Sequence, residues 1–323
     1  MGTHPRKKTK LILSTSNVAG VTSPHLRRLG TDKSNVELVN SLSSQFSANK
    51  NAENVATDGE HFKWCDSLGG TSYEHWTSRE GDYLYVPSID FAQSGLTEER
   101  SQYEITAKLF FLPGSSSGER RVHAQEAVDL VLKELHVSSI DLLIVSFPGI
   151  SFDPNSHCDD PNTRGTGNTG EGEDYDSIAR TWSAIESLHE KGLASRIGVA
   201  EFGSDRLAHF LPKVNISPAV DQIFIKEYCA VPAPLMQYTK QHNIEVLTHE
   251  DCTNILPGGT TRELLGSGEK GAGLLLDQDE SGEGLKGDIF PQWVIKYTAI
   301  VHDRGVVENK GYFAMAELHP QPA

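Results

Sequence analysis

From residue 103 onward, the chain alternates between short apolar runs and stretches with helical periodicity. The apolar runs predict strands over 104–111, 140–145, 196–200, 219–225 and 244–247. Apolar residues at three- and four-residue steps predict helices over 122–136, 177–191, 205–211 and 233–241, and a late helix over 289–301. This alternation is typical of βα units built around a parallel sheet.

The first hundred residues follow a less regular pattern, with a strand predicted over 11–13 and a helix over 35–46. Two polar stretches interrupt the later pattern, 151–176 and 258–288. Because their compositions offer little apolar surface to bury, we expect both to be flexible insertions. A chain of 323 residues with this pattern fits one α/β domain spanning residues 1–323.

The net charge and the spacing of the cysteines limit which partners and which cellular compartment we expect for this chain. The chain has 29 basic and 44 acidic residues, a net charge of −15, which excludes nucleic acid and anionic membranes as main partners. The polar, basic residues 1–10 do not form a secretory signal. Cys65, Cys158, Cys229 and Cys252 lie far apart in sequence, so we expect neither a disulfide framework nor a zinc site, and a cytoplasmic location.

Two motif-like stretches are better explained as ordinary structure. The GxGxxG pattern occurs at 165–170 and again at 266–271, but both copies lie in the polar insertions rather than between a strand and a helix. The run His249 to Cys252 has metal-binding residue types, yet adjacent residues on an extended chain point to alternate faces. We therefore expect no dinucleotide turn and no metal site.

Three segments resemble the aldo-keto reductase family. Residues 130–148 (LVLKELHVSSIDLLIVSFP) are similar to a helix and strand of that family, and 196–202 (RIGVAEF) and 220–223 (VDQI) are similar to two later strands. The resemblance implies an α/β fold of the (β/α)8 TIM barrel type. In such barrels the functional residues lie at the carboxyl ends of the strands.

The residues that carry the chemistry of this family are only partly present. The family uses Asp, Tyr, Lys and His, with the Tyr donating a proton while a nicotinamide delivers hydride. Lys108 matches the lysine position, but Ser146 holds the histidine position and we find no matching Asp and Tyr pair. Glu308 lies where the family binds the NADP phosphate, and an acid there disfavours a phosphate. We expect Lys108 and Ser146 to be relict positions, with no catalytic residue and no cofactor.

Other segments resemble the regulatory subunits of glutamate–cysteine ligase: 10–20 (KLILSTSNVAG), 105–111 (ITAKLFF), 244–252 (IEVLTHEDC) and 293–313 (WVIKYTAIVHDRGVVENKGYF). The resemblance implies a non-catalytic subunit in glutathione biosynthesis. It would form a heterodimer with the catalytic subunit of the ligase, tune its activity and weaken feedback inhibition by glutathione.

We expect the partner to bind at the loops after the strands and at the C-terminal segment, with Cys229, Lys310 and Tyr312 as candidate contacts. The alternative function is that of an NADP-dependent aldo-keto reductase, or of a relict that still binds the nucleotide.

Overall fold

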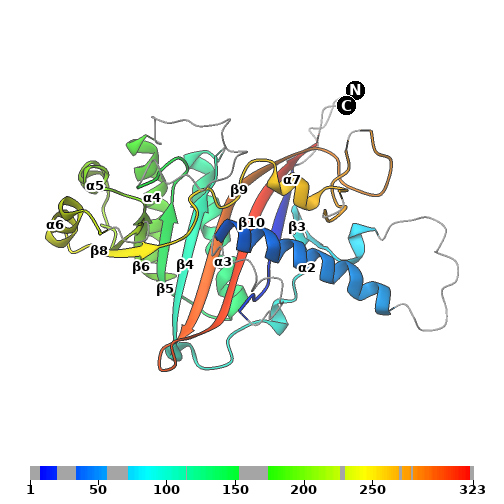
Figure 1. Cartoon of the computed structure of the whole chain (residues 1–323), viewed down its shortest axis with the longest axis horizontal. Coiled ribbons are helices and arrows are strands. Elements are labelled where there is room, and N and C mark those ends of the chain that lie inside the picture. Colours follow the sequence, from blue (N-terminus) through cyan, green and yellow to red (C-terminus); the bar gives the residue numbers. More distant parts are fainter. Residues whose placement is uncertain are drawn as a thin grey trace.

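A computed structural model describes residues 8–19, 34–56, 72–113, 115–152, 174–225, 230–268, 271–277 and 279–320. Ten strands form one sheet in the order β2-β3-β1-β10-β9-β4-β5-β6-β7-β8, with helices on both faces (Figure 1). Within these residues, no helix is both long and apolar enough to span a membrane.

The strands are β1 (Thr9–Ser14), β2 (Ser78–Glu80), β3 (Tyr83–Val86), β4 (Tyr103–Phe111), β5 (Ile140–Ser146), β6 (Ala194–Ala200), β7 (Val220–Phe224), β8 (Glu245–His249), β9 (Asp288–Val301) and β10 (Val306–His319). The α-helices are α2 (Ser34–Ala56), α3 (Ser117–Leu135), α4 (Tyr175–Glu190), α5 (Ser204–Phe210), α6 (Ala233–Gln241) and α7 (Thr260–Leu265). The predicted strands and helices between 104 and 247 are confirmed, as are the early strand and the first helix.

The α/β class and the parallel βα units expected from the family resemblance are confirmed. Strands β4 to β8 run parallel in sequence order, and the helices α3 to α6 connect them. The rest of the sheet differs from a simple eight-fold repeat. A long antiparallel hairpin, β9 and β10, lies between β4 and β1, and among the described residues no pairing joins β2 to β8.

The predicted late helix over 289–301 is wrong, because this segment is strand β9. Its second half is rich in β-branched residues, including Val294, Ile295, Thr298 and Ile300, which favour a pleated surface. Strand β9 pairs along its length with β10 and also with β4, so ladder hydrogen bonds on both sides outweigh its helix-like periodicity.

Two hydrophobic clusters cover the two faces of the sheet. The larger one packs α3, α4, α5 and α6 against one face, with Trp182 fully buried at its centre. The second packs α2 and α7 against the opposite face of the strands around β10. Figure 1 shows α2 crossing in front of β9 and β10 while α3 lies behind the sheet.

The expectation that 258–288 buries little apolar surface is also wrong. This segment contains α7, and both Leu265 and Leu274 are fully buried in the cluster under α2. Four leucines at 264, 265, 274 and 275 supply enough apolar area to order a stretch whose average composition is polar. In the other expected insertion, residues 153–173 lie outside the described residues.

Candidate functional site: a buried charge cluster at the carboxyl ends of the strands

Three polar side chains lie in register across the middle of the sheet. Lys108 of β4 is opposite Lys296 of β9, and Lys296 is opposite Tyr312 of β10. Cross-strand neighbours point to the same face of a sheet, and Tyr312 belongs to the cluster under α2. The fold therefore brings two lysines and a tyrosine together on the face that α2 covers.

Asp251 joins the two lysines. One of its carboxylate oxygens accepts a hydrogen bond from Lys108 Nζ at 3.1 Å, and the other accepts from Lys296 Nζ at 2.7 Å. Burial alone would raise the pKa of Asp251, but the positive charges of Lys108 and Lys296 outweigh it and hold this pKa well below its usual value. Burial lowers the pKa of Lys108, and Asp251 opposes that shift. The single carboxylate compensates two like charges that would otherwise repel each other across the strands.

His249, at the end of β8, connects this ion pair to Glu201. The backbone N–H of Asp251 donates to His249 Nδ1 at 3.0 Å, and His249 Nε2 lies 2.6 Å from Glu201 Oε1. Since Nδ1 accepts a hydrogen bond, the imidazole proton must be on Nε2, which donates a hydrogen bond to Glu201. This geometry assigns His249 as a neutral imidazole held in one tautomer.

Glu201 follows β6 in an unusual backbone conformation. Its φ is +68°, which is unfavourable for a residue with a side chain by about 1 kcal/mol. The carboxylate, 1% exposed, also accepts hydrogen bonds from the backbone N–H groups of Phe152 and Phe224. Burial would raise the pKa of Glu201, but these donors and His249 hold it below its usual value. Three hydrogen-bond donors thus hold this buried residue in its strained conformation.

Tyr312 and Lys310 both bind Glu37 of α2. The Tyr312 hydroxyl donates to one carboxylate oxygen of Glu37, and Lys310 Nζ donates to the other at 2.5 Å. Burial, together with the charge and hydrogen bond of Glu37, raises the pKa of Tyr312 far above its usual value. A tyrosine in this setting keeps its proton, so its environment is opposite to that of a proton-donating catalytic tyrosine.

The three residues predicted to contact the partner differ in their exposure. Tyr312 is fully buried, so its side chain cannot form a partner surface, and that assignment is corrected. Lys310 is half-buried and stays a prediction. Cys229 lies outside the described residues.

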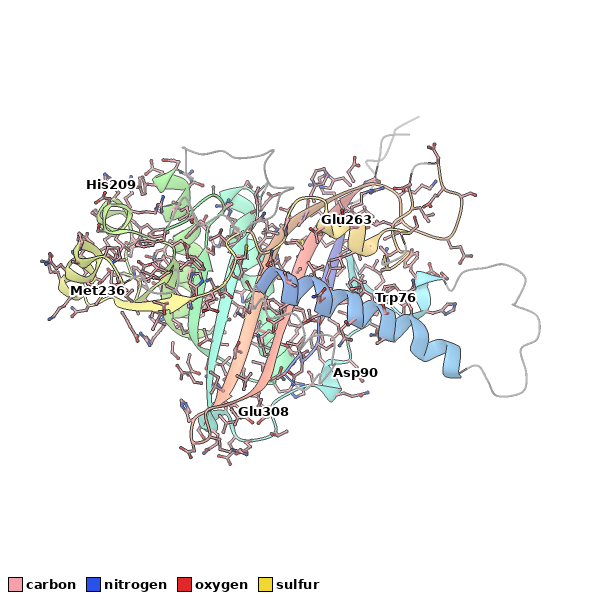
Figure 2. The ribbon with its side chains drawn as sticks, in the orientation of Figure 1. Trp76, Asp90, His209, Met236, Glu263 and Glu308 are labelled. Carbon is pink, nitrogen blue, oxygen red and sulfur yellow. The ribbon has the colours of Figure 1, made fainter. Side chains whose placement is uncertain are left out.

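The two relict positions are both buried at the carboxyl side of the parallel strands. Lys108 is 4% exposed and keeps an acidic partner, while Ser146 is 4% exposed at the end of β5 and offers only a hydroxyl group. Glu308 lies elsewhere: its carboxylate accepts from Thr97 and from the Tyr103 hydroxyl, at the start of β4. Figure 2 labels Glu308 near the end of the hairpin, so it does not face the charge cluster.

Among the described residues, no group of three or more His, Cys, Asp or Glu side chains could hold a metal ion. The second GxGxxG run begins with the glycine that ends α7, so it follows a helix rather than opening one. Cys252 is disulfide-bonded. The spacing of the cysteines predicted no disulfide framework, and this single bond departs from the reducing environment that the spacing indicated.

Sequence reasoning missed most of this site. His249 and Asp251 were weighed as metal ligands and interpreted as a strand end and a turn, Lys296 was placed in a helix, and Glu201 and Glu37 were not singled out. The sequence held one signal for Glu201. It is an acidic residue that directly follows a buried strand, and in a TIM barrel the functional residues lie at the carboxyl ends of the strands. The pairing of Lys108 with Lys296 depends on strands far apart in the chain and has no local signal.

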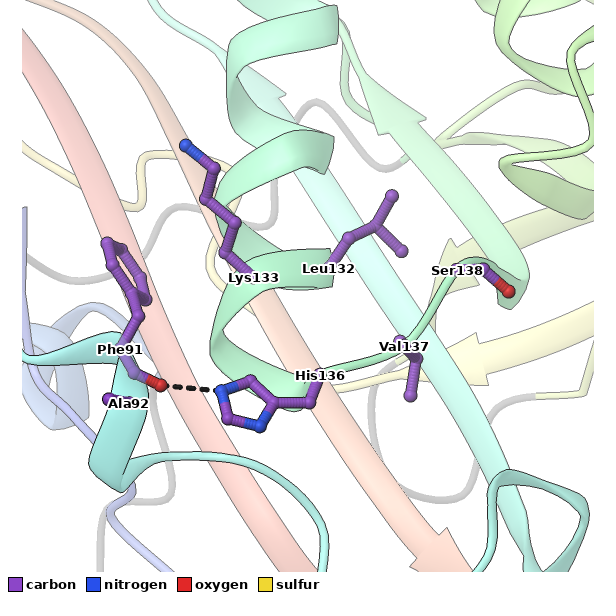
Figure 3. Close-up of a pocket in the computed structure, with 7 residues that line it drawn as sticks. All are labelled: Phe91, Ala92, Leu132, Lys133, His136, Val137 and Ser138. Carbon is purple, nitrogen blue, oxygen red and sulfur yellow. Dashed lines mark hydrogen bonds between the residues drawn. The ribbon is translucent and has the colours of Figure 1, made fainter.

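A separate hollow of about 600 Å³ lies between the end of α3 and the turn at residues 91–93 (Figure 3). Its walls are largely apolar, with Phe91, Leu132 and Val137 among them. Lys133, His136 and Ser138 also line it, and His136 Nε2 is already 2.5 Å from the Phe91 carbonyl oxygen. Because α3 ends where β5 is about to begin, this hollow lies away from the charge cluster, and we assign it no ligand.

Comparison with known proteins places the chain in a family. The sequence pattern of the aldo/keto reductase family matches residues 83–254, more than half of the chain. The chain belongs to the aldo/keto reductase family. This family member is 24% identical over 325 residues, 96% of its length and 97% of the other protein, to a Schizosaccharomyces pombe protein provisionally named a glutamate–cysteine ligase regulatory subunit.

Two further relatives and one solved structure are also similar to this member of the aldo/keto reductase family. It is 24% identical over 220 residues, 68% of each chain, to the human glutamate–cysteine ligase regulatory subunit. It is 30% identical over only 131 residues, 38% of each chain, to an NADPH-dependent D-xylose reductase of Candida boidinii. The solved aldose reductase of Giardia lamblia covers 48% of each chain at 26% identity with a TM-score of 0.35, too low to support a detailed superposition.

Proposed function

We propose that this chain is a non-catalytic regulatory subunit that binds the catalytic subunit of glutamate–cysteine ligase and weakens its feedback inhibition by glutathione. The observation that carries the proposal is the similarity to a regulatory subunit over 96% of the chain, whereas the similarities to two reductases cover 38% and 55% of it. A subunit of this kind acts by binding one conformation of its partner better than another.

The chemistry of the buried cluster supports a non-catalytic role. Ser146 cannot supply the imidazole hydrogen bond that the family's histidine provides. The Tyr312 hydroxyl, which lies on the same face as Lys108, donates a hydrogen bond to Glu37, and the pKa of Tyr312 is raised rather than lowered. His249 and Asp251 are occupied with Glu201 and the two lysines. These side chains satisfy one another, as expected of groups that position backbone rather than move protons.

A second candidate function is NADPH-dependent carbonyl reduction, or nucleotide binding without turnover. One observation favours it: Lys108 keeps a buried carboxylate partner at 3.1 Å, and the family uses an Asp beside its Lys. We expect no NADPH-dependent reduction of an aldehyde and no rise in melting temperature with millimolar NADPH. Turnover or a clear thermal shift would favour the second candidate.

Co-purification with the catalytic subunit from the same organism tests the proposal directly. We expect a complex on size exclusion, and ligase rates that need more glutathione for half inhibition when the complex is present. If the two chains elute separately at micromolar concentrations, or if the glutathione response is unchanged in a complex that does form, the proposal is wrong.

A further inference from the structure

The sheet ends at β8 with one edge unpaired. β8 is the last strand of the sheet and, within the described part of the chain, pairs only with β7. The backbone N–H of Glu245 donates to the Ala219 carbonyl at 2.9 Å, so residues 245, 247 and 249 turn their backbone groups toward β7. Val246 and Thr248 therefore turn theirs outward, where the described residues offer no strand. Such an edge is a template for an added strand.

The edge at β8 is less protected against strand pairing than the opposite edge of the sheet. The opposite end of the sheet, β2, is only three residues long and exposes the charged side chains of Arg79 and Glu80. β8 has five residues (EVLTH) with one exposed acid, Glu245, and with neither lysine nor proline. Its register with β7 runs through five consecutive pairs without a bulge. Natural edge strands are normally shortened, charged or bulged to prevent pairing.

The residues around β8 suit a docking strand. His249 anchors the carboxyl end of the strand through its 2.6 Å contact with Glu201, so this end is already ordered before a partner binds. Beside the strand, α6 exposes Met236, whose side chain is 47% accessible and lies at this end of the molecule in Figure 2. A rigid edge next to an exposed methionine offers both backbone hydrogen bonds and apolar contact.

Charge indicates what kind of chain would bind. Both ends of the strand carry exposed acids, Glu245 and Glu250, and the whole chain has a net charge of −15. Glu245 is already paired with Arg196. Two copies of this chain meeting at β8 would bring their net negative charges together, which is unfavourable. A different chain with basic residues beside its strand is complementary.

We propose that the outer edge of β8 is the docking strand of this subunit, where an extended strand of the partner chain, with lysine or arginine beside it, joins the sheet. The inference rests on the proposed function, which makes that partner the catalytic subunit of glutamate–cysteine ligase. Backbone groups of Val246 and Thr248 supply the hydrogen bonds, and Glu250 supplies the charge contact.

Thr248→Pro tests the edge with little effect on the sheet itself. Proline removes the outward N–H and adds bulk on that side, while the bonds of Leu247 and His249 toward β7 remain. Thr248→Val is the matched control, because it keeps the backbone N–H and a β-branched side chain. With the full-length chains, we expect Thr248→Pro to weaken binding to the catalytic subunit at least about tenfold. Thr248→Val should bind within about twofold of the wild type.

The results of this binding experiment distinguish a failure of the docking edge from a failure of the proposed regulatory function. If the wild type does not bind the catalytic subunit, the proposed function is wrong and this occupant is excluded with it. If the wild type binds and Thr248→Pro binds equally well, only the docking edge is wrong. If the chain alone sediments as a dimer that Thr248→Pro converts to a monomer, the occupant is a second copy and the proposal is overturned.

If circular dichroism shows that Thr248→Pro does not fold, two further measurements test the docking edge. Hydrogen exchange of the wild-type peptide covering 245–249 should slow at least about tenfold in the complex, because edge amides become bonded. Glu250→Lys should slow association, and the salt dependence of the association rate should weaken with it. Unchanged exchange at 245–249 in the complex would overturn the proposal.

Discussion

Lys108 and Lys296 face each other across antiparallel strands β4 and β9, and both donate to the carboxylate of Asp251. Asp251 comes from the loop after β8, at the far side of the parallel half of the sheet. One short segment, His249 to Asp251, therefore ties the end of β8 to the centre of the sheet.

Asp251→Asn should destabilise the protein strongly. The change keeps the shape of the side chain but leaves two neighbouring lysines without a negative charge, and removing one partner of a buried ion pair costs about 3–5 kcal/mol. Urea denaturation measures the free energy of unfolding. The control is Asp277→Asn, which removes an exposed ion pair with Arg262 (3.0 Å) and should cost at most about 1 kcal/mol. Equal losses in the two variants would contradict a buried, paired Asp251.

The stability of the wild type should fall in acid through Asp251 and Glu201. Their pKa values are lowered by folding, so the stability that they contribute is present above the ordinary carboxyl pKa of about 4 and is lost as the pH falls below it. Asp251→Asn removes one of these groups. We expect its free energy of unfolding to decrease less than that of the wild type between about pH 4 and pH 2. Parallel pH profiles would show that Asp251 does not titrate as the structure indicates.

His249 should be a neutral imidazole with its proton on Nε2. In ¹⁵N NMR spectra at neutral pH, we expect its Nδ1 to resonate as an unprotonated ring nitrogen. His249→Ala should lower the free energy of unfolding by about 1–3 kcal/mol, since Glu201 loses a donor in a buried site. His302→Ala is the control, because that side chain is exposed and its backbone bond is kept. A signal from a protonated Nδ1 would contradict the assigned tautomer.

Leu274→Ala tests whether the segment 258–288 belongs to the core. Leu274 is fully buried beneath α2, so the cavity should cost about 2–5 kcal/mol in the free energy of unfolding. Leu276→Ala, two positions away and only half-buried, should cost clearly less. If both variants unfold at the same denaturant concentration, the segment does not contribute to the core as described.

The candidate site could be predicted only in part. Lys108 and Ser146 were found because they lie in strands with clear apolar signatures and a family resemblance. Glu201 and His249 also end strands, but nothing in their spacing shows that they meet, because β6 and β8 are separated by β7. Lys296 was not recognised as a site residue, because the segment that forms β9 was predicted to be a helix.

The sequence by itself determined the local elements of this protein, because periodicity is a property of neighbouring residues. The apolar run at 140–145 and the helical stripe of α4 needed no knowledge of the rest of the chain. Only the tertiary structure decided that 288–301 is a strand, since its ladder partners lie in β4 and β10. It also decided that Asp251 neutralises two lysines and that β8 forms an edge. Pairing between distant segments leaves no local pattern, because the free energy of such contacts depends on the whole sheet.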